Sequence, residues 1–235
     1  ILGVPNMFKK MLDEPSFDGP HLKKLRLLWA GGDTVSENFL NTFNSKLQKW
    51  GSKGKLLRGY GLTEVTSVCT ANCAAAYREN SIGRPLAEID IQIWDEKKKK
   101  LPPNTIGEIV ISGDTVMNGY LNSADSGVYT DRKGRRYVLS GDLGYLDEDG
   151  YLYFTGRKKR LIIISGYNVY PSDIESKVLT LDYVDEACAV QGYLDGKPIV
   201  KLFVTLKEPS ANEDETALEI KEFCNKTLER FSRPT

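Results

Sequence analysis

The sequence has 235 residues, of which 40% are apolar, enough to build the core of one large domain or two smaller ones. Its 32 basic and 32 acidic residues cancel, so no net charge attracts nucleic acid or an anionic membrane. The longest aliphatic run, Leu161 to Ile164, is far shorter than the roughly 20 residues of a membrane-spanning helix. We therefore expect a soluble protein that binds neither nucleic acid nor membranes.

The cysteines bear on the cellular compartment of the protein, and the ends of the sequence bear on whether it is a complete protein. The four cysteines match neither a C-x-x-C zinc pair nor a dense disulfide framework, which favours the reducing cytoplasm. The chain begins at Ile1 and ends at Thr235, shortly after a helical pattern. We expect a piece of a longer protein.

Residues 1–80 have the pattern of an α/β layer. A short apolar strand, Leu25–Ala30, leads into Gly31-Gly-Asp33, and an apolar stripe from Val35 to Trp50 predicts a helix that Gly51 terminates. A second strand, 55–57, leads into Arg58-Gly-Tyr-Gly61. Glycines at the carboxyl ends of strands indicate part of an open α/β sheet with a ligand site beyond those ends.

Residues 81–156 instead contain short β-type runs separated by turns, at 89–94, 107–111, 137–139 and 151–154. They predict a small antiparallel, barrel-like subdomain, and we interpret Lys97–Lys100 as a solvated hairpin tip. The charged stretch 157–160 predicts a boundary. Residues 161–235 then read as a small α+β domain, with a helix from Ser172, two strands joined through Asp195-Gly196, and a last helix. The apolar face of that last helix comprises Ile220, Phe223, Cys224, Thr227, Leu228 and Phe231.

Two motifs in the first region could bind a ligand. Gly31-Gly-Asp33 lets a flat ligand lie against the backbone, although a turn with Asp33 or Thr34 as helix cap explains it as well. Tyr60-Gly-Leu-Thr-Glu64 offers a ring for stacking, a hydroxyl for phosphate and a carboxylate for hydrated Mg²⁺. The alternative is an ordinary loop with a capping threonine.

Two later stretches are less specific. The Asp142 carboxylate in Ser140-Gly-Asp-Leu143 could accept both hydroxyls of a ribose diol, but the same sequence also forms common turns. Arg157 offers a planar fork of donors for ribose or phosphate oxygens. Ser172 and Glu175 predict a capping box, and Gly166 and Asn168 predict positive φ.

The ordered set of motifs resembles the adenylate-forming (AMP-binding) ligases, which include acyl-CoA synthetases, luciferases and peptide-synthetase adenylation domains. The resemblance covers essentially the whole chain. It is carried by Tyr60-Gly-Leu-Thr-Glu64, Gly141-Asp142, Gly156-Arg157-x-Lys159 and Gly166-x-Asn168-Val-Tyr-Pro171. Ser81-Ile-Gly-Arg-Pro85, Gly107–Gly113 and Asn118–Leu121 look like the same family.

The resemblance implies that a carboxylic acid and Mg·ATP form an acyl-adenylate and pyrophosphate, after which the thiol of coenzyme A displaces AMP. It implies that Tyr60 and Gly61 bind adenine beside Gly31, Gly32, Asp33 and Phe154. Thr63 would contact phosphate and Glu64 would hold Mg²⁺. Asp142 and Arg157 would bind the ribose. Lys159 would be the hinge of a rotating small domain, and Gly166 would line the pantetheine channel.

Two family features are not found in this sequence: the Ser/Thr/Gly-rich phosphate loop and the Pro-x₄-Gly-Lys segment with its catalytic lysine. Losing one preorganised donor typically costs 10²–10³-fold in rate. We therefore expect a fragment of an ATP-dependent acyl-CoA synthetase that is inactive or weakly active by itself. The alternatives are a catalytically incompetent nucleotide-binding or interaction fragment, or a peptide-synthetase-like domain that loads a carrier-protein phosphopantetheine. An open sheet edge at Leu25–Ala30 would favour self-association.

Overall fold

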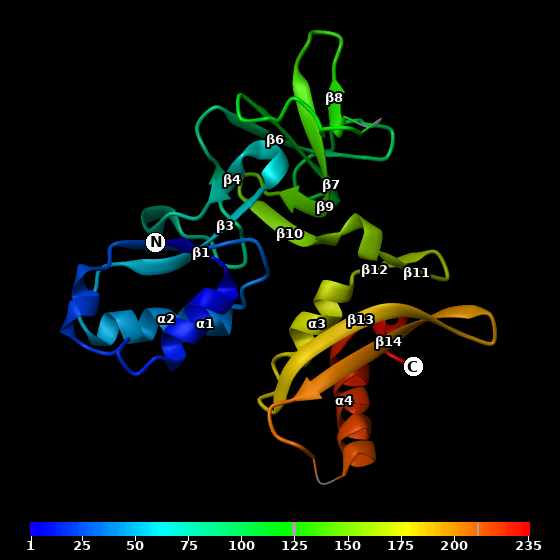
Figure 1. Ribbon diagram of the computed structural model, residues 1–235. Helices are drawn as coiled ribbons and strands as arrows, with labels where there is room; N and C mark the ends of the chain where they lie inside the picture. The colour runs from blue at the N-terminus through cyan, green and yellow to red at the C-terminus, as the bar shows by residue number, and fades with distance from the viewer. Residues whose placement is uncertain (124–125, 211) are drawn as a thin grey trace. The chain divides into compact units, whose positions relative to one another are not determined.

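Figure 1 shows the computed structural model of the chain, which describes residues 1–123, 126–210 and 212–235. The chain divides into two compact units, Ile1–Phe154 and Thr155–Thr235. Each unit has cores of its own. Within the described residues, no helix combines the length and apolar character needed to cross a membrane. The predicted mixture of α/β and α+β layers is confirmed.

The first layer of the larger unit is a five-stranded sheet in the order β1-β2-β3-β4-β5. Its first three strands are parallel, and β4 and β5 are antiparallel. The strands are β1 (Leu2–Gly3), β2 (Leu27–Ala30), β3 (Lys55–Leu62), β4 (Ser67–Ala71) and β5 (Arg84–Pro85). The helices are α1 (Pro5–Asp13) and α2 (Glu37–Lys49), and 3-10 turns cover Pro20–Lys24, Thr63–Val65 and Ala74–Ala76.

Helices α1 and α2 share one apolar core with β2 and β3 (Figure 1). Phe8 of α1 meets Phe43 of α2 edge to face, with ring centroids 5.6 Å apart. The predicted caps of α2 are wrong, because the helix begins at Glu37 and Ser36 accepts the backbone N–H of Phe39 at 3.2 Å. Asp33 instead accepts the N–H of Thr34, at 2.7 Å.

The predicted open edge at Leu25–Ala30 is also wrong. Strand β2 is paired on both sides, with β1 through Trp29 and Ala30 and with β3 along its whole length. The edge position in this sheet is held by β1. Self-association through an unpaired β2 therefore has no structural basis in this unit.

The second layer of the larger unit is the expected antiparallel sheet, in the order β10-β9-β7-β6 with β8 paired to β9. The strands are β6 (Ile89–Trp94), β7 (Gly107–Gly113), β8 (Val128–Thr130), β9 (Arg136–Leu146) and β10 (Leu152–Arg157). The sheet is open rather than a closed barrel, since β6 and β10 are not paired among the described residues. The lysine run occupies an exposed turn after β6, in which Asp95 Oδ1 accepts the N–H groups of Lys97 and Lys99.

The smaller unit consists of two hairpins and two helices around one core. The hairpins are β11 (Ile162–Ile164) with β12 (Tyr167–Val169), and β13 (Val184–Leu194) with β14 (Lys197–Leu206). The helices are α3 (Pro171–Val178) and α4 (Glu213–Thr227), with 3-10 turns at Lys158–Arg160 and Arg230–Ser232.

Three local predictions in this unit are wrong. Ser172 and Glu175 form no capping box, because α3 begins at Pro171, one residue before Ser172. The Ser172 hydroxyl donates to Thr155 O, and Glu175 accepts the N–H of Ala189 at 2.9 Å. Positive φ in the first hairpin belongs to Ser165 and Gly166, not to Asn168. The last helix stops at Thr227, so Leu228 and Phe231 reach the core from the segment that follows.

Candidate functional site

Tyr60 and Asp142, 82 residues apart in the sequence, meet in the larger unit. The Tyr60 hydroxyl on β3 donates a hydrogen bond of 2.7 Å to Asp142 Oδ2 on β9. The Phe154 ring on β10 lies beside them, with its centroid 6.4 Å from that of Tyr60. Three of the residues expected to bind a nucleotide are therefore brought together by the fold.

A β-bulge places Asp142. The pairing of β7 with β9 shifts register where Gly141 lies with a φ of 71°. Ser140 anchors the bulge by donating to Ile109 O at 2.6 Å and accepting the Asp142 N–H at 3.1 Å. Bulges of this kind re-aim a side chain out of the regular alternation of a strand. Glycine accommodates the positive φ without strain.

The Asp142 carboxylate is closed off in this structure, since the residue is only 1% exposed. Burial, together with the neighbouring Asp142 carboxylate, raises the pKa of the Tyr60 phenol well above its usual value. The phenol therefore stays protonated and remains a donor. A ribose diol could reach this carboxylate only if its hydroxyl groups replaced the phenol as donors.

Gly31, Gly32 and Asp33 lie at the carboxyl end of β2, next to the motif on β3. In the parallel register Ala30 is opposite Arg58, and the next residues, Gly31 and Gly59, also lie close together. A side chain on Gly31 would come within 3.0 Å of Gly59 O, which explains the absence of one there. The Gly31-Gly-Asp33 motif thus follows the carboxyl end of a parallel strand, the kind of position where ligands of open α/β sheets bind.

Thr63 and Glu64 lie on the short turn that follows β3. Val65 anchors this turn in the core, and Thr66 and Ser67 have φ values of 63° and 100°. Glu64 Oε1 accepts a hydrogen bond of 2.5 Å from the Tyr120 hydroxyl. No sequence pattern indicated this partner, because the two residues are 56 positions apart.

The chemistry of these donors fits Mg²⁺ that arrives with a polyphosphate. Among the residues described, no group of three His, Cys, Asp or Glu side chains is arranged to hold a metal ion. Mg²⁺ is commonly bound by one or two carboxylates together with substrate phosphates and water, rather than by a cage of protein ligands. The Glu64 carboxylate, with the Thr63 hydroxyl beside it, is suited to that arrangement.

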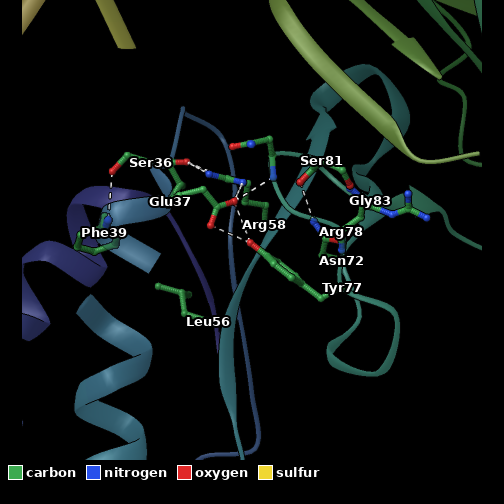
Figure 2. A network of polar contacts seen from close by, with 12 residues as sticks. Ser36, Glu37, Phe39, Leu56, Arg58, Asn72, Tyr77, Arg78, Ser81 and Gly83 are labelled. Carbon is green, nitrogen blue, oxygen red and sulfur yellow. Dashed lines mark hydrogen bonds and ion pairs between the residues drawn. The ribbon is translucent and has the colours of Figure 1, made fainter. Parts of the chain in front are cut away.

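A buried ion pair missed at the sequence level connects β3 to the start of α2 (Figure 2). Arg58, 7% exposed, pairs with Glu37 and also donates to Val35 O, at 2.9 Å from Nε. Glu37 in turn accepts the Tyr77 hydroxyl at 2.9 Å and the Asn80 N–H at 3.0 Å. The one sequence signal for this ion pair was Arg58, a charged residue that directly follows the apolar strand 55–57.

The pKa values of Glu37 and Tyr77 indicate which groups of this Arg58–Glu37–Tyr77 network are charged. Burial opposes the ionisation of Glu37, but the Asn80 N–H, the Arg58 charge and the Tyr77 hydroxyl outweigh it, so the pKa of Glu37 lies below its usual value. Burial and the hydrogen bond to Glu37 raise the pKa of Tyr77 to about 12. At neutral pH the network therefore consists of a carboxylate, a guanidinium and a neutral phenol.

Arg157, Lys159 and Gly166 belong to the smaller unit. Arg157 is the exposed last residue of β10, and Lys159 lies in the exposed 3-10 turn that follows. Gly166 forms the tip of the β11–β12 hairpin with a φ of 85°. Arg160 is tied to this unit by Glu175 at 2.5 Å and by Ala189 O at 3.4 Å.

Comparison with known proteins defines the class. The profile of the family described as "AMP-binding enzyme" matches residues 1–121, more than half of the chain. The chain therefore belongs to the AMP-binding enzyme family.

Particular relatives agree with this assignment. Over its whole length the chain is 31% identical to a long-chain-fatty-acid–CoA ligase of Escherichia coli O6:H1, of which it covers 40%. It superimposes on the ATP-bound RpMatB-BxBclM chimera B1 with a TM-score of 0.87 at 30% identity, covering 100% of this chain and 46% of that one. O-succinylbenzoate coenzyme A synthetase from Bacillus subtilis, in complex with ATP and Mg²⁺, gives a TM-score of 0.80 at 27% identity, with 100% and 46% coverage. The chain thus spans less than half the length of these relatives.

Proposed function

We propose that the chain forms part of an ATP-dependent acyl-CoA synthetase and supplies the residues that bind AMP. The observation that carries this proposal is the meeting of Tyr60, Asp142 and Phe154, with Tyr60 on β3, the strand that pairs with β2. Similar solved structures are complexes with ATP, with ATP and Mg²⁺, and with an acyl-adenylate. These ligands share an adenosine monophosphate group.

In the proposed reaction, a carboxylate oxygen of the acid attacks the α-phosphorus of ATP. The bond from that phosphorus to the bridging oxygen breaks, and pyrophosphate leaves with the electron pair. The sulfur of coenzyme A then attacks the acyl carbon, the bond from that carbon to the AMP oxygen breaks, and the thiol proton passes to solvent. Mg²⁺, when bound, neutralises charge on the phosphates.

The chain's own residues have proposed roles in binding and orientation. Tyr60 and Phe154 would flank the adenine beside Gly61 and Gly31–Asp33. The Asp142 carboxylate would accept the ribose hydroxyls in place of the Tyr60 phenol. Thr63 would donate to a phosphate oxygen, and Glu64 would bind the Mg²⁺ that accompanies it.

For the smaller unit the proposed roles rest on family resemblance. Arg157 would bind the ribose, Lys159 would be the hinge between two half-reactions, and Gly166 would line the pantetheine channel. All four cysteines are free thiols. We propose the cytoplasm as the compartment of the reaction, because free thiols persist there.

Isothermal titration with AMP tests the nucleotide site. We expect Asp142→Asn to weaken AMP binding by about 10-fold or more, because an amide group offers one acceptor where the carboxylate offers two, and hydrogen bonds to charged groups contribute about 1.5–3 kcal/mol each. The control Asp90→Asn removes a partly exposed carboxylate that pairs with Arg135 at 3.4 Å and accepts from the Gln92 amide at 2.7 Å, and it should bind AMP normally.

The ligand provides a second control, because 2′,3′-dideoxy-AMP lacks both ribose hydroxyls. The wild-type chain should bind it more weakly than AMP, and Asp142→Asn should cause little further loss. Equal losses for AMP and dideoxy-AMP would show that the carboxylate does not contact the ribose. Failure of the wild-type chain to bind AMP at all would refute the proposed function for this polypeptide.

A further inference from the structure

The Glu64 carboxylate has one hydrogen-bonding side-chain partner in the described structure, the Tyr120 hydroxyl, with 2.5 Å between Tyr120 Oη and Glu64 Oε1. A glutamate on a short, partly exposed turn can adopt several rotamers, and a bound ligand must select one of them. A donor fixed to one carboxylate oxygen restricts that choice before the ligand arrives. Tyr120 can restrict the Glu64 rotamer only if Tyr120 is itself held in place.

The segment that carries Tyr120 is fastened to the Glu64 turn. The Met117 N–H donates to Glu64 O at 2.9 Å, and the Thr66 hydroxyl donates to Thr115 O at 3.0 Å. Val116, between these two contacts, is buried in the same core as Val65. Residues 115–117 therefore form a strap, that is, a segment fastened along the Glu64 turn by two hydrogen bonds and a shared core. The position of this strap relative to the turn is fixed.

Beyond the strap, Tyr120 is held by its own backbone and ring. Its N–H donates to Ser126 O at 3.1 Å. Its ring lies so close to Gly127 that a Cβ atom there would come within 2.3 Å of Tyr120 Cε2. Arg136 fixes the intervening backbone by donating to Met117 O at 3.2 Å and to Asn118 Oδ1 at 2.7 Å. Tyr120 is thus half exposed, yet its backbone and ring contacts hold it in place.

We propose that Tyr120 is a positioning residue for the Glu64 carboxylate: it donates to one carboxylate oxygen and leaves the other for the Mg²⁺ of Mg·ATP. This inference rests on the proposed function, because that function supplies the metal. The donor set fits the role, because an ionised carboxylate is an acceptor only and the Tyr120 hydroxyl supplies the donor. Hydrogen bonds that orient a metal ligand typically contribute 10–100-fold to metal affinity.

The alternative role for Tyr120 is purely structural, as a ring that packs on Gly127. The variant Tyr120→Phe separates the two roles, because it keeps the ring and removes only the hydroxyl. The matched control is Tyr77→Phe, which removes a phenol that also donates to a glutamate in the same unit, Glu37, outside the proposed site. Tyr77 is 38% exposed and Tyr120 is 50% exposed, so neither residue is fully buried.

The experiment measures binding of the α,β-methylene analogue of ATP to the full chain by isothermal titration across a series of Mg²⁺ concentrations. The methylene group replaces the oxygen whose bond to the α-phosphorus breaks in the proposed reaction. A parallel titration with AMP in the absence of divalent metal measures nucleotide binding alone. For Tyr120→Phe we expect the Mg²⁺ concentration at half-saturation to rise about 10–100-fold, while the AMP dissociation constant stays within about twofold. Tyr77→Phe should match the wild-type chain in both titrations.

The possible contrary results are distinct. An unchanged Mg²⁺ dependence in Tyr120→Phe would overturn the inference, and so would an equal weakening of both ligands, which would indicate a structural role. Wild-type binding of AMP without any effect of Mg²⁺ on the ATP analogue would overturn the inference and leave the nucleotide site intact. Absence of binding of either nucleotide by the wild-type chain would overturn the proposed function, and the inference with it.

Discussion

Removing the Glu37 carboxylate is expected to destabilise the larger unit. In Glu37→Ala, the Arg58 guanidinium would remain buried and would still donate to Val35 O, but it would have lost its counter-charge. The side chains of Arg58 and Glu37 are 9% and 20% exposed. Breaking a buried ion pair by removing one partner costs about 3–5 kcal/mol. Because Glu37 keeps some contact with water, we expect the lower end, about 3 kcal/mol.

Tryptophan fluorescence reports on this unit selectively, because all three tryptophans, Trp29, Trp50 and Trp94, lie in residues 1–154. With a urea m-value of about 2 kcal/mol/M, a loss of 3 kcal/mol lowers the unfolding midpoint by roughly 1.5 M. The double variant Glu37→Leu/Arg58→Met removes both charges together and should return to within about 1 kcal/mol of the wild-type chain.

Two results would refute this reasoning. One is a midpoint shift below about 0.5 M for Glu37→Ala, which would place the pair among the weak surface ion pairs. The other is a double variant no more stable than Glu37→Ala, which would assign the loss to packing or to the lost hydrogen bonds from Tyr77 and Asn80 instead of to an unpaired buried charge.

Two further predictions use the same preparation. The pKa of Glu37 is lower when folded than its ordinary value of 4.5, so its stabilisation is complete above that value and disappears as the pH falls through the folded pKa. The urea midpoint should therefore drop on acidification below about pH 4.5, and less steeply in Glu37→Gln. Cys73 and Cys188 are exposed, whereas Cys69 and Cys224 are buried, and burial raises the pKa of Cys69 to about 12. At pH 8 an aromatic disulfide reagent should react quickly with the two exposed thiols and reach all four only in urea. Rapid reaction of four thiols in the native chain would contradict the assigned burial.

Elements with a clear apolar period were predictable from the sequence. The stripe from Val35 to Trp50 indicated α2, and Gly51, with a φ of 72°, terminates it as expected. The run 89–94 coincides with β6. Such patterns are local because burial on one face repeats with the period of the helix or strand.

Caps and turn residues were predicted less well. Asp33 and Thr34 were as plausible as Ser36 for the cap of α2, and the Ser172–Glu175 spacing indicated a capping box that does not form. Many short polar side chains can cap a helix when only the sequence is considered. Which one does so depends on where packing begins the helix, and in α3 Glu175 is instead committed to Arg160 and Ala189.

The sequence by itself determined the family and supplied the residues proposed to bind a nucleotide, because Tyr60, Glu64 and Asp142 lie in short motifs whose chemistry can be read locally. Tertiary structure alone decided their partners. The hydrogen bonds Tyr60–Asp142, Tyr120–Glu64 and Arg58–Glu37 join residues 82, 56 and 21 positions apart. No local sequence pattern predicts such a pair, because it forms only when separate strands and turns pack together. Packing then leaves a buried donor that needs an acceptor within about 3 Å.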